Sequence, residues 1–297
     1  MSGVTGTAGS TTARQGMAQP RGRTPAPVPK RPVTRSRPSG RIATNIREIG
    51  AIGVMTRRTV VSALRPPYSY GPELVSQFVF GLRMAWFPMI VASLAFTYGP
   101  AGIQAAGFLN LFGAIDRLGG LFAMVVMREF APLVCAIVMA GVVGTSMCAD
   151  LGARKIREEI DALTVLGIDP IKSLVAPRFI ALISLTALLN VFALLFGTLG
   201  GMLVTVSNSA PIGPFFATFF TNATVPEVAA SLVKTTIFGA IIAIVCCYKG
   251  LSAKGGAEGV GRAVNEAIVI AFMAIGVVNY VFTQTLLATY PELSAVR

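Results

Sequence analysis

The sequence predicts an all-α integral membrane protein, in which an N-terminal interfacial helix precedes five transmembrane helices. Hydrophobic residues make up 54% of the 297-residue chain and charged residues only 13%, and the mean hydropathy is +0.69. A soluble domain carries about 25% charged residues, so this chain has too few to cover a water-facing surface. Several apolar runs exceed the roughly 20 residues that cross a bilayer, and none alternates with the period of two that membrane barrels show.

Five long runs are nearly free of charge. The predicted spans cover residues 84–115, 118–149, 179–206, 228–248 and 267–291. Gly99-Pro100 interrupts the first run, so its second part is expected to be a broken or re-entrant piece.

The N-terminal 67 residues divide into two parts. Residues 1–41 hold six Pro, six Gly, eight Lys or Arg and no acid, which predicts a disordered basic arm. The arm is either a solvated tail or a tether for anionic lipid. Residues 42–67 carry Ile42, Ile46 and Ile49 at helical spacing beside arginines, and end at Pro66-Pro67. This pattern predicts an interfacial amphipathic helix, or alternatively a helix packed on another protein.

Positive charge orients the spans. With the N-terminus in the cytoplasm, 21 of the 25 Lys and Arg lie inside, and the external loops hold only Arg117. We therefore expect a multi-pass protein of the plasma (inner) membrane with a cytoplasmic N-terminus and the C-terminus outside.

Composition also excludes classes of function. The net charge of +12 indicates topology and contact with anionic membrane lipid rather than nucleic acid. The chain has no His, and its four Cys lie in apolar runs without metal or disulfide spacing. No phosphate-binding loop of the G-x-x-x-x-G-K-[ST] type occurs, so the chain is not expected to bind ATP, to hold a metal or cofactor, or to be an enzyme.

Residues 150–178 form the most informative loop, with five acids and five bases in 29 residues. Ile156, Ile160 and Leu163 form an apolar stripe at helical spacing. Gly167 fits the position just after a helix, and Asp169-Pro170 starts a new turn. The loop is thus predicted to be a short amphipathic helix followed by a turn.

The stripe needs a covering surface, either the membrane or a partner protein, and charges of both signs favour a protein groove. Ion pairs at i, i+4 are expected between Lys155 and Glu159 and between Arg154 and Glu158. The predicted docking residues are Arg154, Ile156, Glu158, Glu159, Ile160, Asp161, Leu163 and Gly167.

The loop at 249–263 is rich in glycine. It follows a predicted span rather than a strand, so it is not a nucleotide-binding fingerprint. Its glycines are expected to allow a tight turn and close packing at the membrane face. The residues singled out are Gly255, Gly256, Glu258, Gly259, Gly261 and Arg262.

Arg128 and Glu129 are charges within a predicted span, about ten residues from its start. Charges inside a membrane are costly and usually pair or face a cavity. The two are sequence neighbours about 100° apart on a helix, so they need not pair with each other. The alternative is that the helix begins near them and both lie in the polar interface.

The run REFAPLVCAIVMAG…GTSMCADLGARKIREEIDALTVLGIDPIKSLVAPR at 128–178 resembles the MlaE/YrbE permease family. The run GGAEGVGRAV…NYVFTQTLL resembles the C-terminal signature of the same family, and the likeness covers about 42–290. With its Arg/Pro-rich extension, the chain resembles an actinobacterial YrbE, the permease of a Mce lipid-import system, and the A-type rather than the B-type subunit.

The resemblance implies an MlaE-like permease domain over 68–297 with a fold similar to ABCG exporters. It implies a permease dimer, a separate cytoplasmic ATPase dimer that binds ATP and Mg, a ring of MCE-domain proteins outside, and a lipid substrate. The family's coupling helix would correspond to 154–167, and its conserved glutamate to Glu129. Lipid would move through an apolar cavity that ATP binding reshapes. A secondary transporter or a membrane scaffold is the alternative.

Two residues depart from the pattern that the resemblance implies. The family often has Arg where this chain has Val142, and Asp where it has Asn279. Arg128, Glu129 and Asn279 are therefore predicted to lie at the lipid path or the subunit interface. A second, different YrbE-like subunit could supply the missing charges, which favours a heterodimer.

Overall fold

The computed structural model describes residues 41–64 and 70–290, and every regular element in these two ranges is helical, which confirms the predicted fold class. The basic arm at 1–40 lies outside the described residues. The elements are α1 Arg41–Leu64, α2 Gly71–Phe96, η1 Thr97–Ile103, α3 Gln104–Leu111, η2 Ile115–Arg117, α4 Leu118–Val125, η3 Val126–Phe130, α5 Ala131–Val138, η4 Met139–Gly144, α6 Thr145–Ile156, α7 Glu159–Val165, η5 Ile171–Val175, α8 Ala176–Ser207, α9 Ile212–Asn222, α10 Val225–Leu251 and α11 Gly256–Thr289.

Five helical segments are long and apolar enough to cross a membrane, as the hydropathy predicted. They cover Gly71–Leu111, Ile115–Ile156, Ile171–Ser207, Val225–Leu251 and Gly256–Thr289. Each is longer than its predicted apolar run, because the helices continue into more polar sequence at their ends.

The first span is not interrupted by a re-entrant loop. Pro100 lies in η1, a π-helical turn, and the chain remains helical from α2 through η1 into α3. Proline lacks the N–H that a regular helix needs, and a wider turn accommodates that loss without breaking the segment. The expected break at Gly99-Pro100 is therefore only a local change of helix type.

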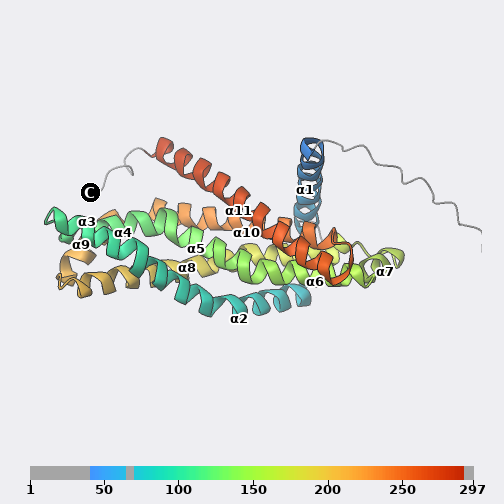
Figure 1. The fold of residues 1–297 in the computed structure, drawn as a ribbon, viewed down its shortest axis with the longest axis horizontal. Coiled ribbons are helices and arrows are strands. Elements are labelled where there is room, and N and C mark those ends of the chain that lie inside the picture. The colour runs from blue at the N-terminus through green and yellow to red at the C-terminus, as the bar shows by residue number, and fades with distance from the viewer. Residues whose placement is uncertain (1–40, 65–69, 291–297) are drawn as a thin grey trace, which may run out of the picture.

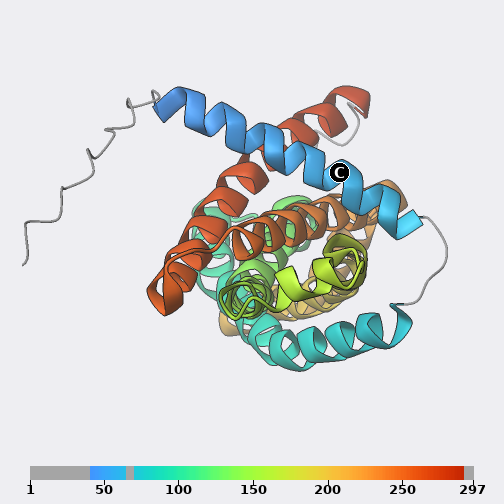
Figure 2. The same cartoon turned by 90° about the vertical axis from the view of Figure 1, so that its right-hand side faces the viewer.

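The long helices lie side by side, with α7 at one end of the bundle and α3 and α9 at the other (Figure 1). At the α7 end, α1 runs across the long axis of the bundle (Figures 1 and 2). The loops at 150–178 and 249–262, predicted to be cytoplasmic, lie at the α7 end, and the external loops predicted near 116–117 and 207–227 lie at the α9 end (Figure 1). The crosswise course of α1 is the one expected of an interfacial helix.

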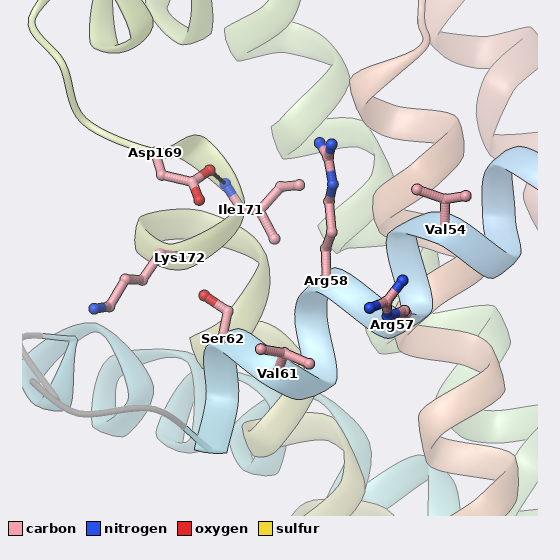
Figure 3. A pocket seen from close by; sticks show the side chains of 8 residues that line it. All are labelled: Val54, Arg57, Arg58, Val61, Ser62, Asp169, Ile171 and Lys172. Carbon is pink, nitrogen blue, oxygen red and sulfur yellow. Dashed lines mark hydrogen bonds between the residues drawn. The ribbon is translucent and has the colours of Figure 1, made fainter.

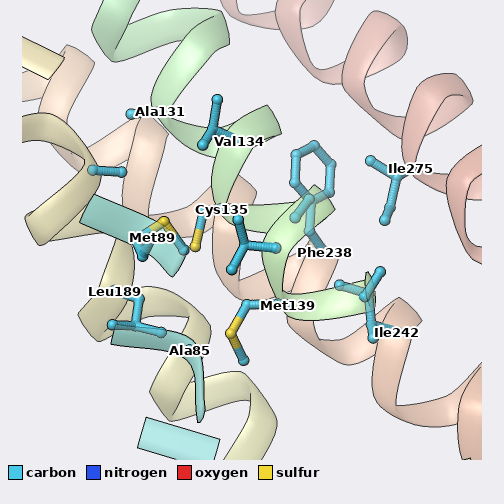
Figure 4. Packing of buried hydrophobic residues seen from close by; sticks show 14 of the residues in the cluster. Ala85, Met89, Ala131, Val134, Cys135, Met139, Leu189, Phe238, Ile242 and Ile275 are labelled. Atoms are coloured by element: carbon cyan, nitrogen blue, oxygen red, sulfur yellow. The ribbon is translucent and has the colours of Figure 1, made fainter. Parts of the chain in front are cut away.

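The core lies between the second, third and fourth spans. About half of the most apolar stretch is buried in these spans (56%, 44% and 50%), against 22% in the first and 17% in the fifth. Cys135, Met139 and Phe238 belong to this core, and Met89 of the first span joins the same cluster (Figure 4). All four cysteines are free and buried, so they serve as small core residues, as expected.

Glycines allow the helices to approach closely. A Cβ added at Gly144 would lie 2.9 Å from Ile242, and one at Gly201 would lie 2.4 Å from Phe122. Gly197 and Gly200 likewise pack against Val126 and Thr97, whereas Gly141 faces open space. Small residues therefore allow close helix packing at Gly144, Gly197, Gly200 and Gly201, but not at Gly141.

The fifth span joins the bundle along only part of its length. The buried residues of α11 are Gly259, Ala263, Ala267, Ala271 and Ile275, all in its first two thirds. The C-terminal end of α11 lies away from the rest of the bundle (Figure 1). The last part of α11 therefore presents a largely uncovered face.

Candidate functional site

Glu129 is the centre of a polar cluster inside the membrane-spanning bundle. Its Oε1 lies 3.2 Å from Nζ of Lys234 and accepts a hydrogen bond of 2.7 Å from the hydroxyl of Thr283. Its Oε2 accepts a hydrogen bond of 2.8 Å from the side-chain amide of Asn279. Glu129 is therefore paired with a cation from another segment, Lys234 of α10.

The ammonium of Lys234 donates hydrogen bonds to three polar groups. Besides Glu129, its ammonium donates to the carbonyl of Arg128 at 2.7 Å and to the hydroxyl of Thr283 at 2.9 Å. Its side chain is only 2% exposed. A buried ammonium needs such acceptors and a counter-charge, since an unpaired charge in this environment is strongly destabilising. The cluster thereby joins η3, α10 and α11.

Arg128 pairs separately with Glu227, through two hydrogen bonds from Nε and an Nη to the same carboxylate oxygen, at 2.8 and 2.5 Å. Glu227 is in the first turn of α10, two helical turns before Lys234, so both partners lie on one face of that helix. Arg128 and Glu129 thus pair with different residues, as their angular separation predicted.

The π-helical turn η3 carries both charged residues. The helix begins earlier, at Leu118 of α4, so Arg128 and Glu129 lie well inside the second span. The alternative reading, in which the helix starts beside them, is therefore wrong. Wider π turns are frequent at functional sites, because they redirect side chains that a regular helix would aim elsewhere.

Sequence reasoning selected Arg128, Glu129 and Asn279, and the structure brings Glu129 and Asn279 into contact. It missed the roles of Glu227, Lys234 and Thr283. The signal that could have found the first two is that both are charged residues in or beside one apolar run. Thr283 carried no signal, since hydroxyl groups are common in membrane helices.

The predicted helix at 154–167 is divided in two. The second span continues to Ile156, and α7 starts anew at Glu159. Glu158 between them has a φ of 60°, in the left-handed region that ends helices. The expected single helix is thus the last turn of α6 followed by the short helix α7.

The end of α7 is as predicted. Gly167 has a φ of 76°, its N–H bonds to the carbonyl of Thr164, and the N–H of Ile168 bonds to the carbonyl of Leu163. This pattern is a Schellman motif, which requires the glycine. Asp169 then caps the next turn by accepting a hydrogen bond of 2.9 Å from the N–H of Ile171.

The apolar stripe is covered mostly by the chain itself. Ile160 is 6% exposed and lies in a second core cluster with Met55, Leu151, Leu174, Val175 and Cys247. Ile156 of the stripe remains 37% exposed, and the most exposed apolar side chains nearby are Val165 and Leu166, at 87% and 74%. We call Val165 and Leu166 the α7 tip.

The predicted i, i+4 ion pairs do not form. Lys155 pairs with Asp161 at 2.6 Å, and Arg154 pairs with Asp150 at 3.2 Å. Glu159 pairs with Arg157 at 2.7 Å. The reason is the helix break at Glu158, which ends the regular helical spacing that the prediction assumed. These pairs are partly exposed and each contributes little stability.

The glycine loop makes the predicted tight turn. Gly255 and Gly256 have φ values of 91° and 72°, which a glycine adopts without strain. A Cβ at Gly259 would lie 1.8 Å from the carbonyl oxygen of Lys254, whereas Gly261 has open space around it. Arg262 and Glu258 approach to 3.8 Å on the exposed face. Close packing is thus confirmed at Gly259 and not at Gly261.

Two cations join the helices at the α7 end. Arg178, fully buried, donates to Asp150 at 2.6 Å and lies 3.7 Å from Glu73, so it connects α8 with α6 and α2. Lys249 of α10 contacts Glu48 of α1 and, at 2.8 Å, Glu266 of α11. Within the described ranges, no three His, Cys, Asp or Glu residues lie close enough to hold a metal.

Known proteins resemble this chain over most of its length. Residues 74–285 match the family described as Permease MlaE. A probable ABC transporter permease of Rickettsia typhi is 31% identical over 242 residues, which is 80% of this chain and 92% of the relative. A probable ABC transporter permease of Synechocystis is 37% identical over 179 residues, which is 60% of this chain and 68% of the relative.

A plant protein also matches. The chloroplast protein TRIGALACTOSYLDIACYLGLYCEROL 1 of Arabidopsis thaliana is 31% identical over 190 residues, covering 61% of this chain and 52% of its own. The family match spans all five membrane-crossing helices, and the bacterial relatives are permeases of similar extent. This chain therefore belongs to the MlaE family of permeases, the non-catalytic membrane subunits of ABC-type lipid transporters.

Proposed function

We propose that this chain is one of two permease subunits of a Mce-type importer for fatty acids, phospholipids or related hydrophobic molecules. A second, YrbE-like subunit completes the membrane dimer, a separate ATPase dimer binds ATP and Mg, and a ring of MCE-domain proteins receives or delivers lipid outside. Membership of the MlaE family supports the ABC and lipid parts of this proposal. The plant relative is named after a glycolipid, which agrees with a lipid substrate.

The observation that carries the proposal is the α7 tip. Val165 and Leu166 are exposed at the end of the bundle that holds α1 and the basic loops. Exposed apolar side chains ringed by charged residues are typical of a protein contact. The surrounding charges include Asp161 and Glu159, which would steer a partner and set its register. We assign this surface to the ATPase.

The other face of α7 suits the transmission of movement. Ile160 belongs to one apolar cluster with residues of α1, α6, η5 and α10, namely Met55, Leu151, Leu174, Val175 and Cys247. A closely packed apolar contact cannot be compressed, so displacement of α7 would displace those helices. In this mechanism ATP binding draws the two ATPase subunits together, α7 follows, and the spans rearrange around the lipid.

The lipid path is proposed to run beside α11. A groove of about 440 Å³ with an almost wholly apolar lining lies between α1, α10 and α11. Its lining includes Ile52, Phe179, Ile241 and Ile270. The second subunit would cover the uncovered face of α11, and the Glu129 cluster would lie beside the path near its outer end. This chain has Val142 and Asn279 where the family often has Arg and Asp. A non-identical second subunit could supply these two charges, which favours a heterodimer.

The proposed site is the plasma membrane, with the α7 end in the cytoplasm and the end of α11 outside. Lys and Arg concentrate in the loops at the α7 end, which supports this orientation. The ATPase can reach the α7 tip only in this orientation.

Co-purification with the cognate ATPase tests the proposal. Leu166→Asp should abolish recovery of the ATPase while the permease stays folded and inserted, because the change places a charge in an apolar contact. Leu111→Asp is the matched control, since Leu111 is 83% exposed at the opposite end. Wild-type recovery of the ATPase with Leu166→Asp would reject the docking assignment.

A further inference from the structure

A cationic hollow lies between α1 and the turn that follows α7. Its lining includes no residue of the Glu129 cluster or of the α7 tip. Its volume is about 730 Å³. Figure 3 shows its walls, with α1 on one side and the start of η5 on the other. The lining residues are Val54, Arg57, Arg58, Val61, Ser62, Asp169, Ile171 and Lys172.

The charge of the hollow is positive. Arg57, Arg58 and Lys172 contribute three cations, against the single acid Asp169. Asp169 already accepts a hydrogen bond from the N–H of Ile171 (dashed in Figure 3), so part of its acceptor capacity is used within the turn. None of the three cations forms an ion pair with any side chain in the described part of the chain.

The same stretch of α1 exposes apolar side chains beside these cations. Val54 is 57% exposed, Val61 38% and Leu64 71%. Since α1 crosses the bundle at the α7 end, this surface lies near the ends of the spans (Figure 1). Apolar side chains at that level face the acyl region of a bilayer, and basic residues there face lipid phosphates.

We infer that this hollow binds the phosphate-bearing headgroup of an anionic phospholipid from the leaflet at the α7 end. Arg57, Arg58 and Lys172 extend in different directions (Figure 3), so they would surround the phosphate with positive charge, and the hydroxyl of Ser62 can add a hydrogen bond. Val54 and Val61 would lie along the first part of the acyl chain. This lipid is a resident of the membrane rather than the transported molecule, and it would bind α1 to the turn that follows α7.

Other occupants fit less well. The arm at 1–41 carries eight Lys or Arg and no acid, so like charge would repel it from the hollow. An acidic segment of a partner protein shares the charge of a phospholipid, but its charged side chains would not cover the exposed apolar side chains of Val54, Val61 and Leu64. The combination of cations and apolar side chains favours a lipid.

Native mass spectrometry of the delipidated full chain in detergent tests this inference. Dioleoylphosphatidylglycerol should bind more tightly than dioleoylphosphatidylcholine, and inorganic phosphate should not displace it at equal concentration. Arg58→Gln with Lys172→Gln should weaken phosphatidylglycerol binding roughly fivefold for each charge removed. Arg58→Lys with Lys172→Arg should preserve binding, which separates loss of charge from loss of fold.

The matched control removes two cations of the same end that lie outside the hollow, Arg47→Gln with Lys254→Gln, and should bind phosphatidylglycerol like the wild type. Equal binding by the Arg58/Lys172 variant, or an equal loss in the control, would overturn the inference. Displacement by inorganic phosphate would overturn the lipid in favour of a free anion. Normal lipid binding together with lost ATPase recovery would instead assign the hollow to a protein partner.

Discussion

Glu129 and Lys234 form an ion pair inside the membrane-spanning bundle, with 3.2 Å between Oε1 and Nζ, although 105 residues separate them in sequence. The two partners differ in burial, since the side chain of Lys234 is 2% exposed and that of Glu129 is 33% exposed. The pair joins α10 to the π-helical turn η3. Asn279 and Thr283 extend it to α11, the span that is least attached to the bundle.

This difference in burial predicts unequal effects of removing each partner. Glu129→Leu leaves a buried ammonium without its counter-charge and should cost about 3–5 kcal/mol. Lys234→Met leaves a carboxylate that is partly exposed and still bonded to Asn279 and Thr283, so it should cost less. The fraction of each variant that stays monodisperse after heating in detergent measures the order. The reverse order would contradict the geometry.

Charge reversal at the same site separates stability from transport. Glu129→Lys would place two ammonium groups together, so uptake of labelled lipid by cells should fall. Lys234→Glu in the same chain restores opposite charges and should recover part of the uptake. Glu129→Gln keeps hydrogen bonding and should preserve expression while uptake decreases. Normal uptake by Glu129→Lys would show that the cluster has no part in transport.

Asn279 offers a pH-dependent test. Its amide donates to Glu129 at 2.8 Å, so Asn279→Asp would place a second carboxylate against the first. Two carboxylates this close cannot both be ionised without a large cost. The variant should therefore resist heating better at pH 5, where one of them is protonated, than at pH 8. Asn279→Leu, which adds no charge, should show no such difference between the two pH values. Equal resistance of the Asp variant at both would reject the contact.

The glycine loop contains its own matched pair. Gly259→Ala would drive a methyl group into the carbonyl of Lys254 and should destabilise the protein by about 1–3 kcal/mol. Gly261 has open space around it, so Gly261→Ala should be neutral or stabilising by about 0.5–1 kcal/mol. Thermal unfolding of the two variants decides, and similar melting temperatures would mean that the turn is not as compact as described.

Topology can be tested with single cysteines, because the four native cysteines are buried and should give little background. A membrane-impermeant maleimide added to intact cells should label Asn208→Cys and leave Ala257→Cys unlabelled. Both positions are exposed, so access and not burial decides the result. Labelling of Ala257→Cys in intact cells would invert the proposed orientation.

The sequence predicted the features that depend on local chemistry. Hydropathy identified all five spans, and Gly167 with Asp169 marked the end of α7 and the start of the next turn. Periodicity also placed Ile160 on an apolar face. It could not say what covers that face, because a neighbouring helix of the same chain and a partner protein leave the same pattern in sequence.

The sequence did not predict which residues from distant parts of the chain contact one another. Lys234 is an isolated cation in an apolar run, and nothing local states that it meets Glu129. The break at Glu158 was also hidden, since glutamate favours helices and rarely adopts a positive φ. That break shifted the ion pairs of the loop and left Val165 and Leu166 more exposed than Ile156 and Ile160 of the predicted stripe.

The most direct test of the account is ATP-dependent movement of a fluorescent phospholipid in proteoliposomes that contain both permease subunits, the ATPase and the MCE-domain proteins. The account predicts transfer that requires ATP, that stops when Leu166→Asp removes the ATPase contact, and that continues with Leu111→Asp. Transfer at the same rate without ATP, or undiminished transfer with Leu166→Asp, would contradict it.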